Sequence, residues 1–252
     1  MEPWRTGIVN ARDGEIWIRG RNVTSLMRDA TFTDTIFLLH RGRLPDERER
    51  RLLDAILSAS CDHGPGAPSC ATARLAASGN RQSYSAAIAA GILAIGNEHG
   101  GAGEQCMELI ATGVARATAR ASGIEAAAAE IVAEARASGR RLPGLGHRVH
   151  TVDPRVEVLF SLARVDDRDA DGVRFVVALQ ASAAAAFKEL PINIDGALAA
   201  LLYDLGFPPA AGKLLFIISR VAGLTAEVAE EYSREKPMRI RIPVEYDGVP
   251  PE

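Results

Sequence analysis

The sequence lacks the features that mark several classes of protein. Its three cysteines are an odd number without zinc-ligand spacing, which argues against a disulfide framework and indicates a reducing cytoplasm. No apolar run reaches the roughly 18 residues that span a bilayer, and residues 1–4 do not begin a signal peptide. The formal net charge of −3, with 24% charged residues, implies no affinity for nucleic acid or anionic membranes. We therefore expect a cytoplasmic protein that binds neither.

Aromatic residues are also scarce, at 5%, and alternation of apolar and polar residues is rare outside residues 14–19 and 238–243. Alanine is abundant instead, with runs at residues 126–129 and 183–186. Because alanine is the best helix former and lets helices approach closely, we expect an all-α protein with two short strands near its start. About eleven helices are predicted, at residues 24–29, 32–41, 46–60, 68–77, 83–95, 102–115, 124–138, 155–162, 172–187, 194–205 and 210–235, the last broken near Gly223.

One stretch has three features that suit a ligand: LPGLGHRV at residues 142–149, followed by DPR at 153–155. Glycines flank Leu145, so the backbone there can approach another molecule closely. His147 can donate a hydrogen bond or take up a proton near neutral pH. Arg155 offers a planar fork that matches a carboxylate. A glycine-rich loop before a helix is common, so other residues must support a functional interpretation.

Two further histidines and one aspartate provide that support. His63 and His99 each lie beside a glycine at the end of one predicted helix or the start of the next, as His147 does. Three histidines in matching contexts are difficult to explain by packing alone. Asp195 is the one acid in the apolar run PINIDG, directly before a predicted helix. A carboxylate there also fits a structural role, as a helix N-cap favoured by the helix dipole.

Taken in chain order, these elements resemble the signature of the citrate synthase superfamily. Residues 18–22 are similar to the family's N-terminal YRGYD element, and residues 38–45 to its LLLxGxLP element. The order of the elements from residue 18 to residue 220 makes the match specific. The other similar elements are DHG at 62–64, HGGA at 99–102, GLGHRV at 144–149, DPR at 153–155, NID at 193–195 and SR at 219–220.

The spacing of the elements resembles a short form of that family. Only one predicted helix, at residues 46–59, separates the second element from DHG, where citrate synthases typically have several helices. This layout is similar to the citryl-CoA lyase module of ATP-citrate lyase and to its free-standing bacterial relatives. That module replaces the histidine of the HGGA element, whereas His99 is present here, as in citrate synthases. The architecture indicates a lyase, and His99 indicates a synthase.

The resemblance implies a citrate synthase-like fold with a large helical domain, residues 1–138 and 192–252, and a small CoA-binding domain, residues 139–191, that closes over the substrate. The sequence by itself suggests one domain. The resemblance also implies a homodimer or higher homo-oligomer. No metal is expected, because the histidines are far apart in sequence and the chemistry does not need one. No permanently bound cofactor is expected either, since a coenzyme A thioester is the substrate or product.

Roles for the site residues also follow from the resemblance. Joining acetyl-CoA to a 2-oxo acid requires a base to remove a methyl proton and a neutral donor to stabilise the enol oxygen. Asp195 is the expected base, and His99 the expected donor to the thioester oxygen. His147 polarises the ketone of oxaloacetate, or acts on the citryl hydroxyl in the cleavage direction. The carboxylates of the dicarboxylic 2-oxo acid are expected to be bound by His63, Arg155 and Arg220.

Two parts of the expected site are less defined. Citrate synthases supply an arginine from the partner subunit, and the aligned residue here is Lys236, so either Lys236 serves or Arg239 or Arg241 replaces it. The phosphates of CoA would meet nearby basic groups such as Arg140 and Arg141, which fit a solvated helix end equally well. The CoA-binding residues implied by the glycine loop are Leu142, Gly144, Leu145, Gly146 and Arg148.

Three functions follow. The first is a citryl-CoA lyase-like enzyme that releases acetyl-CoA and oxaloacetate through an enolate, favoured by the compact length. The second is a citrate synthase-type acyltransferase that condenses an acyl-CoA with oxaloacetate or another 2-oxo acid, favoured by His99. The third is a non-catalytic protein that binds CoA or citrate.

Overall fold

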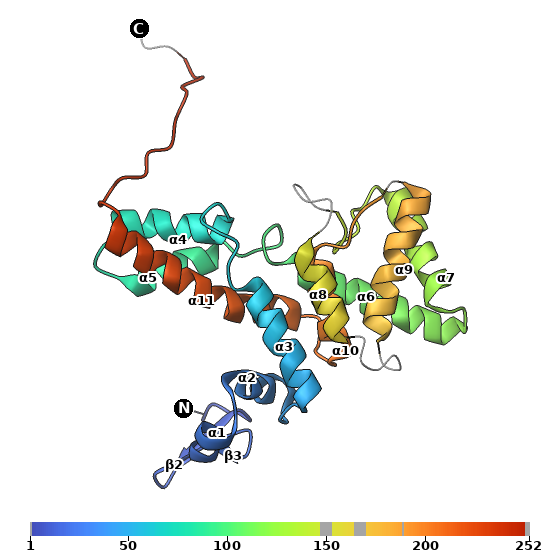
Figure 1. The fold of residues 1–252 in the computed structure, drawn as a ribbon, viewed down its shortest axis with the longest axis horizontal. Coiled ribbons are helices and arrows are strands. Elements are labelled where there is room, and N and C mark those ends of the chain that lie inside the picture. Colours follow the sequence, from blue (N-terminus) through green and yellow to red (C-terminus); the bar gives the residue numbers. More distant parts are fainter. Residues whose placement is uncertain (1, 147–152, 164–169, 188, 250–252) are drawn as a thin grey trace. The chain divides into compact units, whose positions relative to one another are not determined.

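The computed structural model describes residues 2–146, 153–163, 170–187 and 189–249. They form eleven helices and one small sheet, which confirms the all-α class predicted from the sequence (Figure 1). The chain divides into two compact units, which we call the first and second units. The first unit comprises Met1–Ala59 and Gly100–Phe216, and the second comprises Ser60–His99 and Ile217–Glu252.

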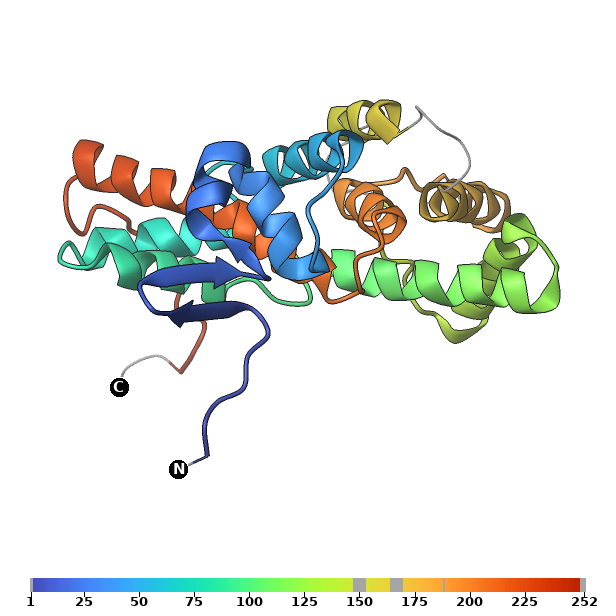
Figure 2. The same ribbon diagram turned by 90° about the horizontal axis from the view of Figure 1, so that it is seen from below.

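Most of the elements belong to the first unit. Its antiparallel sheet has the order β1-β2-β3, and Figure 2 shows the β1 and β2 arrows side by side. The elements are β1 (Val9–Arg12), β2 (Glu15–Ile18), β3 (Arg21–Asn22), α1 (Val23–Asp29), α2 (Phe32–Arg41), α3 (Glu47–Ser60), α6 (Ala102–Arg120), α7 (Ile124–Ser138), α8 (Pro154–Ala163), α9 (Asp171–Ala186) and α10 (Ile194–Asp204). The second unit contains α4 (Pro68–Gly79), α5 (Tyr84–Leu93) and most of α11 (Ala211–Arg234).

Local sequence explains where several helices begin and end. Helix α2 begins with a capping box between Thr31 and Asp34, and it ends at Gly42 with a left-handed φ of 77°. Helix α7 ends at Gly139, which also has a left-handed conformation. Helix α10 begins at a side-chain cap from Asn193. These polar and glycine signals lie close to the helix limits that alanine content and apolar spacing predict.

The core of the first unit forms where α6, α7, α9 and α10 pack together. Phe175 and Leu179 of α9 are fully buried, and the ring of Phe175 occupies the space that a side chain at Gly113 of α6 would need. Helix α10 is buried from Gly196 to Leu202. This close packing fixes the position of the start of α10, where Asp195 lies.

The core of the second unit is built mainly from alanine. Ala73 and Ala77 of α4, Ala87 of α5 and Leu224 of α11 are all fully buried in one cluster. At Gly91 the backbone of α5 passes so close to α4 that an added methyl group would contact the carbonyl oxygen of Ser69 at 2.9 Å. Small side chains therefore let these helices approach closely, as the alanine content predicted.

Two predicted features of the fold are wrong. Helix α11 is continuous, so it is not broken at Gly223. Gly223 serves close packing instead, because a Cβ there would collide with the carbonyl oxygen of Cys61 and the carboxylate of Asp62. The sheet has three strands rather than two, since a third short strand, β3, pairs with β2. Residues 238–243, which alternate like a strand, form no regular element.

The predicted small domain at residues 139–191 stays a prediction, because this range falls inside the first unit, whose limits are different. Among the described helices, none is long and apolar enough to cross a membrane.

Candidate active site

His99 lies in the second unit at the end of a tight turn. Its backbone exchanges two hydrogen bonds with Gly96, at 2.9 and 3.2 Å, and Gly100 follows with a left-handed φ of 81°. The ring nitrogen Nε2 lies 2.9 Å from Ser69 Oγ and accepts the backbone N–H of Ser69 at 3.3 Å. Ser69 belongs to the first turn of α4, where backbone N–H groups have no partner within the helix. The helix start therefore supplies a donor that orients the imidazole.

This contact assigns the tautomer of His99. A backbone N–H can only donate, so Nε2 is an acceptor and the proton of the neutral ring lies on Nδ1. Burial lowers the pKa of His99, and the positive charges of Arg220 and His63 lower it further. His99 is thus a neutral imidazole at neutral pH, with its donor on Nδ1. That is the form required of a neutral hydrogen-bond donor to an enol oxygen.

Arg220 is buried on α11 and is held by several acceptors in the second unit. Its Nε and Nη2 donate to the carbonyl oxygen of Ser60 at 3.2 and 3.1 Å, and its Nη1 donates to Ser69 Oγ at 3.1 Å. Ser69 can therefore accept from Arg220 while its own hydroxyl proton points to His99. The sequence placed Arg220 and His99 in one site, and they lie together through Ser69, a residue that sequence reasoning missed.

Ser69 gave little signal in the sequence. It follows Pro68 at a helix start, where serine is favoured for capping whatever its further role. His63 is an exposed residue of the same unit, and its charge contributes to the lowered pKa of His99. The turn at His63 is stabilised by Asp62, whose carboxylate accepts the backbone N–H of Gly64 at 2.5 Å. His63 and Arg220 thus place positive charge around the neutral His99.

Asp195 lies in the first unit, in the first turn of α10. The N-cap of this helix is Asn193, whose Oδ1 accepts the N–H of Gly196 at 3.0 Å. The structural interpretation of Asp195 as the N-cap is therefore wrong. Cys106 of α6 is fully buried nearby, and burial, followed by the charge of Asp195, raises the pKa of its thiol to about 12. Cys106 stays protonated, while Asp195 is half-buried at a helix N-terminus that favours its negative charge.

The glycine loop is bonded to the segment that carries Asp195. Gly146 donates to Pro191 O at 2.7 Å, and the backbone N–H of Asn193 donates to Gly144 O at 3.1 Å. The side-chain Nδ2 of Asn193 donates to Gly146 O at 2.8 Å. Gly144 and Gly146 have φ values of 85° and 84°, and a Cβ at Gly196 would collide with Gly144 O. Glycine is required at these positions for both conformation and space.

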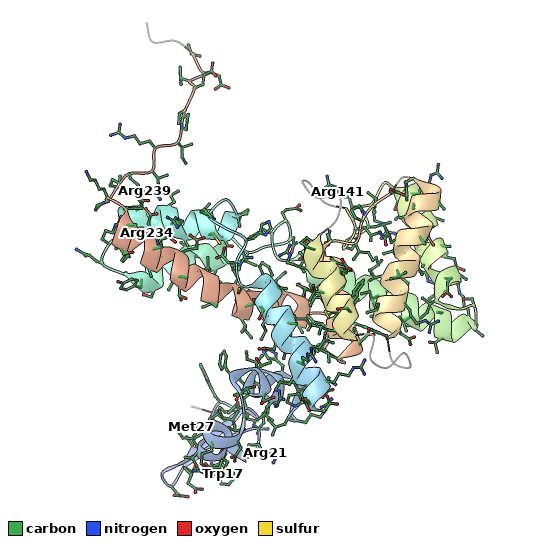
Figure 3. The ribbon with its side chains drawn as sticks, in the orientation of Figure 1. Trp17, Arg21, Met27, Arg141, Arg234 and Arg239 are labelled. Atoms are coloured by element: carbon green, nitrogen blue, oxygen red, sulfur yellow. The ribbon has the colours of Figure 1, made fainter. Side chains whose placement is uncertain are left out.

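The residues beside the loop form a cavity, which we call the basic cavity because three arginines and two glutamates line it. A cavity of about 380 Å³ lies between α6 and α7 and is lined by Arg140, Arg141, Leu142 and Pro143; Arg141 is labelled in Figure 3. Arg116 also lines it and pairs with Glu134. The cavity places positive charge next to the glycine loop, and the loop's Leu142 is itself buried.

Arg155 has a partner that sequence reasoning missed. Its Nε and Nη2 donate to the two carboxylate oxygens of Asp153 at 3.0 and 2.7 Å, and its Nη1 donates to Ala59 O at 3.1 Å. Asp153 is buried. The fork expected to hold a substrate carboxylate is therefore filled by the aspartate of its own DPR motif. His147 and Arg148, the other predicted residues of this stretch, lie outside the described residues.

The three cationic residues proposed for a partner's site lie beyond α11. Arg239 pairs with Glu231 at 2.6 Å and with Glu235 at 3.0 Å, and its position is labelled in Figure 3. Lys236 and Arg241 are exposed.

Another cluster in the second unit has the residue types of a metal site, namely Asp62, Cys70 and Glu227. Their ligand atoms lie within 4.8 Å of one another. Burial and the charge of Asp62 raise the pKa of Cys70, and Glu227 pairs with Arg74. A protonated thiol and a paired carboxylate are poor metal ligands, so the cluster has the character of a buried polar contact.

Comparison with known proteins identifies the family. The model named "Citrate synthase, C-terminal domain" matches residues 45–241. The chain therefore belongs to the citrate synthase family, as its motifs predicted. It is 28% identical over 204 residues to citrate synthase of Haloferax volcanii and 28% identical over 209 residues to a probable ATP-citrate synthase of Caenorhabditis elegans. These alignments cover 79% of this chain but only 51% and 18% of those relatives.

Solved structures show the same fold. Citryl-CoA lyase from Hydrogenobacter thermophilus superimposes with a TM-score of 0.91 at 38% identity, over 100% of this chain and 97% of that chain. ATP citrate lyase from Methanothrix soehngenii, in complex with citrate and coenzyme A, matches 98% of this chain and 43% of its own with a TM-score of 0.76. Its identity of 20% shows the fold alone. The citrate synthase-like fold predicted from the sequence is confirmed.

Proposed function

We propose that this protein is a citryl-CoA lyase, which cleaves citryl-CoA to acetyl-CoA and oxaloacetate. The observation that carries the proposal is the similarity to the Hydrogenobacter thermophilus citryl-CoA lyase over 100% of this chain and 97% of that chain, at 38% identity. The neutral His99 and the half-buried Asp195 support it, because both have the chemistry that the reaction needs. Coenzyme A thioester is substrate here, and the proposed chemistry uses no metal or bound cofactor.

Cleavage is a retro-aldol reaction that needs three groups. His147 removes the proton of the citryl hydroxyl, the carbon–carbon bond breaks, and its electron pair moves into the thioester to form an enolate. His99 donates from Nδ1 to the enolate oxygen, which lowers the barrier as a neutral donor in a partly buried site. Asp195 takes up a proton from solvent before cleavage and transfers it to the enolate carbon, so acetyl-CoA results, and the proton held by His147 returns to solvent. The reverse order of the same transfers describes condensation.

The substrate carboxylates are bound by His63 and Arg220, with Arg155 contributing if a substrate carboxylate exchanges for Asp153. The glycine loop binds the adenine end of CoA through its backbone, and the basic cavity at Arg140 and Arg141 supports a place for its phosphates. The small domain at residues 139–191 is the part that we expect to move over the substrate.

The protein is proposed to act as a homodimer in the cytoplasm, where its three free cysteines stay reduced. No charged residue occurs from Ser83 to Gly96, and Leu93 of α5 is 85% exposed on the same side of the helix as the exposed Ala86 and Ala89. An apolar face of this kind indicates a contact with a second copy. Since Arg239 is ion-paired within its own chain, Lys236 of that copy is the better candidate to reach the site.

Citrate synthase activity is the second candidate, favoured by the retained histidine at position 99. A synthase must also hydrolyse citryl-CoA, and this step separates the two functions. The test incubates the protein with citryl-CoA, following oxaloacetate, and in parallel with acetyl-CoA and oxaloacetate, following free thiol. A lyase cleaves citryl-CoA faster than it releases thiol. Rapid thiol release with accumulation of citrate would show that the protein is a synthase and not a lyase. Binding of CoA or citrate without either reaction would show that the protein is a non-catalytic binder.

A further inference from the structure

The segment after α11 has the sequence pattern of an amphipathic strand but no partner strand. Residues 240–246 read IRIPVEY, so apolar side chains alternate strictly with Arg241, Pro243 and Glu245. Ile242, Val244 and Tyr246 are 67%, 87% and 73% exposed. Within the described part of the chain, no backbone hydrogen bond involves residues 240–246, and neither Arg241 nor Glu245 has an ion pair. Such a segment is a template for pairing with another strand.

Contacts at both ends define this stretch, which we call the tail. Before it, the N–H of Met238 donates to Ser78 O at 2.9 Å, and Arg239 is ion-paired with Glu231. After it, the hydroxyl of Tyr246 donates to Val249 O at 2.6 Å, which makes a local turn. Figure 1 shows the chain between these contacts as a drawn-out trace beyond the end of α11. The tail is thus anchored to its own unit but not packed on it.

We propose that the tails of two copies of this chain pair as an antiparallel ribbon about a twofold axis at Pro243. The charges of the tail are self-complementary in this register. Arg241 of each copy lies opposite Glu245 of the other, so symmetry creates two ion pairs from one sequence pattern. Ile242 lies opposite Val244, and Ile240 lies opposite Tyr246. The apolar residues of both copies therefore share one face of the ribbon, and the charges share the other.

Proline supports the same register. It has no N–H to donate, so Pro243 must occupy a pair without inter-strand hydrogen bonds. Pairs of the two kinds alternate along an antiparallel ribbon, which places the Arg241–Glu245 pairs at non-hydrogen-bonded positions too. Side chains approach most closely there, at about 4.5 Å between Cα atoms. A shift by two residues would instead set Pro243 opposite Arg241 or Glu245 and remove that residue's charge partner.

A two-stranded ribbon is marginally stable alone, so its apolar face must pack on the bodies of the two subunits. The ribbon is therefore a second contribution to the dimer, distinct from the apolar face of α5. The inference rests on the dimer proposed above but not on the reaction. Its test measures association only, and a failure of the lyase assay would leave that test unaffected.

Cysteine cross-linking tests the register. In Pro243→Cys the two sulfur atoms face each other across the axis, and mild oxidation should convert the dimer to a disulfide-linked species on a non-reducing gel. Ile240→Cys is the matched control, because two copies of position 240 lie at opposite ends of the ribbon. The parent protein, with Cys61, Cys70 and Cys106, gives the background. If Pro243→Cys cross-links no more than Ile240→Cys, or the protein is monomeric throughout, the proposal fails.

Charge exchange tests the ion pairs. Arg241→Glu places two glutamates opposite each other twice, and Glu245→Arg does the same with arginines, so each should raise the dimer Kd about tenfold. The double variant restores opposite charges and should return Kd to within about twofold of the parent. Sedimentation over a dilution series measures this. Because both residues are exposed, unchanged thermal unfolding shows that folding is intact. If the two single variants and the double variant raise the dimer Kd equally, the tail packs elsewhere and the proposed ribbon is wrong.

Discussion

Ser69 connects the two basic side chains that the proposed chemistry needs in fixed positions. Its hydroxyl accepts from Arg220 and lies 2.9 Å from His99 Nε2, so it orients the ring from the side opposite the donor Nδ1. The sequence pattern predicted both His99 and Arg220 but not the serine between them. A residue that acts through another leaves no catalytic motif of its own.

We expect Ser69→Ala to lower kcat for citryl-CoA cleavage by about tenfold or more while KM changes little, because the ring loses a hydrogen bond that orients it. Ser78→Ala on the same helix is the matched control. Ser78 is also buried, but within the described residues its hydroxyl has no hydrogen-bond partner. Steady-state kinetics of both variants measure the difference. Similar losses in both would assign Ser69 a packing role.

Asp195→Asn should reduce proton exchange at the methyl group of acetyl-CoA by about 10²–10⁴-fold, as expected on removal of a general base. CoA binding should remain, because Asn193 caps the helix and the fold does not depend on Asp195. Asp171→Asn is the control, since Asp171 is also an acid in the first turn of a helix, α9. Exchange is followed by NMR in deuterated water. Retention of more than about a tenth of the exchange would place the base elsewhere.

Among the elements, the glycine loop and the start of α10 are joined by two backbone hydrogen bonds and by the side chain of Asn193. The side chain of Asn193 caps α10 with Oδ1 and donates to Gly146 O with Nδ2, so it helps to hold the glycine loop next to the helix turn that carries Asp195. The sequence indicated the loop and the aspartate as separate motifs. Their connection was not predictable, because 47 residues separate the bonded positions Gly146 and Asn193.

Asn193→Ser keeps an acceptor for the cap but removes the donor to Gly146. We expect the KM for the CoA substrate to rise about threefold to tenfold, with a loss of stability below about 1 kcal/mol because the cap remains. Asn193→Ala removes both contacts and should also cost about 1 kcal/mol of folding free energy. Kinetics and urea unfolding of the pair separate the two effects. A KM equal to that of the parent in the serine variant would show that the Gly146 contact is only structural.

Asp204, at the end of α10, caps the start of α9 with its side chain. Its carboxylate accepts the N–H groups of Gly172 and Val173 at 2.7 and 3.2 Å, and burial raises its pKa from 3.8 to about 7. Since the folded protein holds this proton more tightly than the unfolded chain, the associated stability is present below pH 4 and is lost as pH rises through 7.

The unfolding free energy of Asp204→Asn should therefore fall less at alkaline pH than that of the parent. Between pH 5 and pH 8.5 the difference in unfolding free energy between variant and parent should shift in favour of the variant by on the order of a few kcal/mol. Urea unfolding at the two pH values measures this. Asp29→Asn, at an exposed acid on α1, should show no such shift, and parallel behaviour of Asp204→Asn and the parent would contradict the raised pKa.

For the whole molecule, the attachment of the tail depends on a buried charge. Glu231 of α11 is fully buried and is paired with Arg74 at 3.0 Å and Arg239 at 2.6 Å. Both arginines lower the pKa of Glu231 against the effect of burial. Arg239 is the last residue before the tail, so this network ties the free end of the chain to the second unit.

Arg74→Met should cost about 3–5 kcal/mol of folding free energy, because the buried carboxylate of Glu231 then loses one of its two ion-pair partners. Arg239→Met should cost less, since its side chain is 35% exposed and water replaces part of the contact. Denaturant unfolding compares the two. Equal costs, or a negligible cost for Arg74→Met, would show that the network is not the support of this end of the chain.

The sequence by itself determined the family, the helical class and most helix limits, because alanine content, caps and glycine signals act within a few residues of one another. It also determined which residue types are present for the reaction. Tertiary structure decided what these signals could not: that Asn193 rather than Asp195 caps α10, that Asp153 fills the fork of Arg155, and that Ser69 joins His99 to Arg220. The helix break predicted at Gly223 was wrong for a related reason. A glycine selected for close approach to Cys61 looks the same in sequence as one selected for flexibility, and only the packed neighbour distinguishes them.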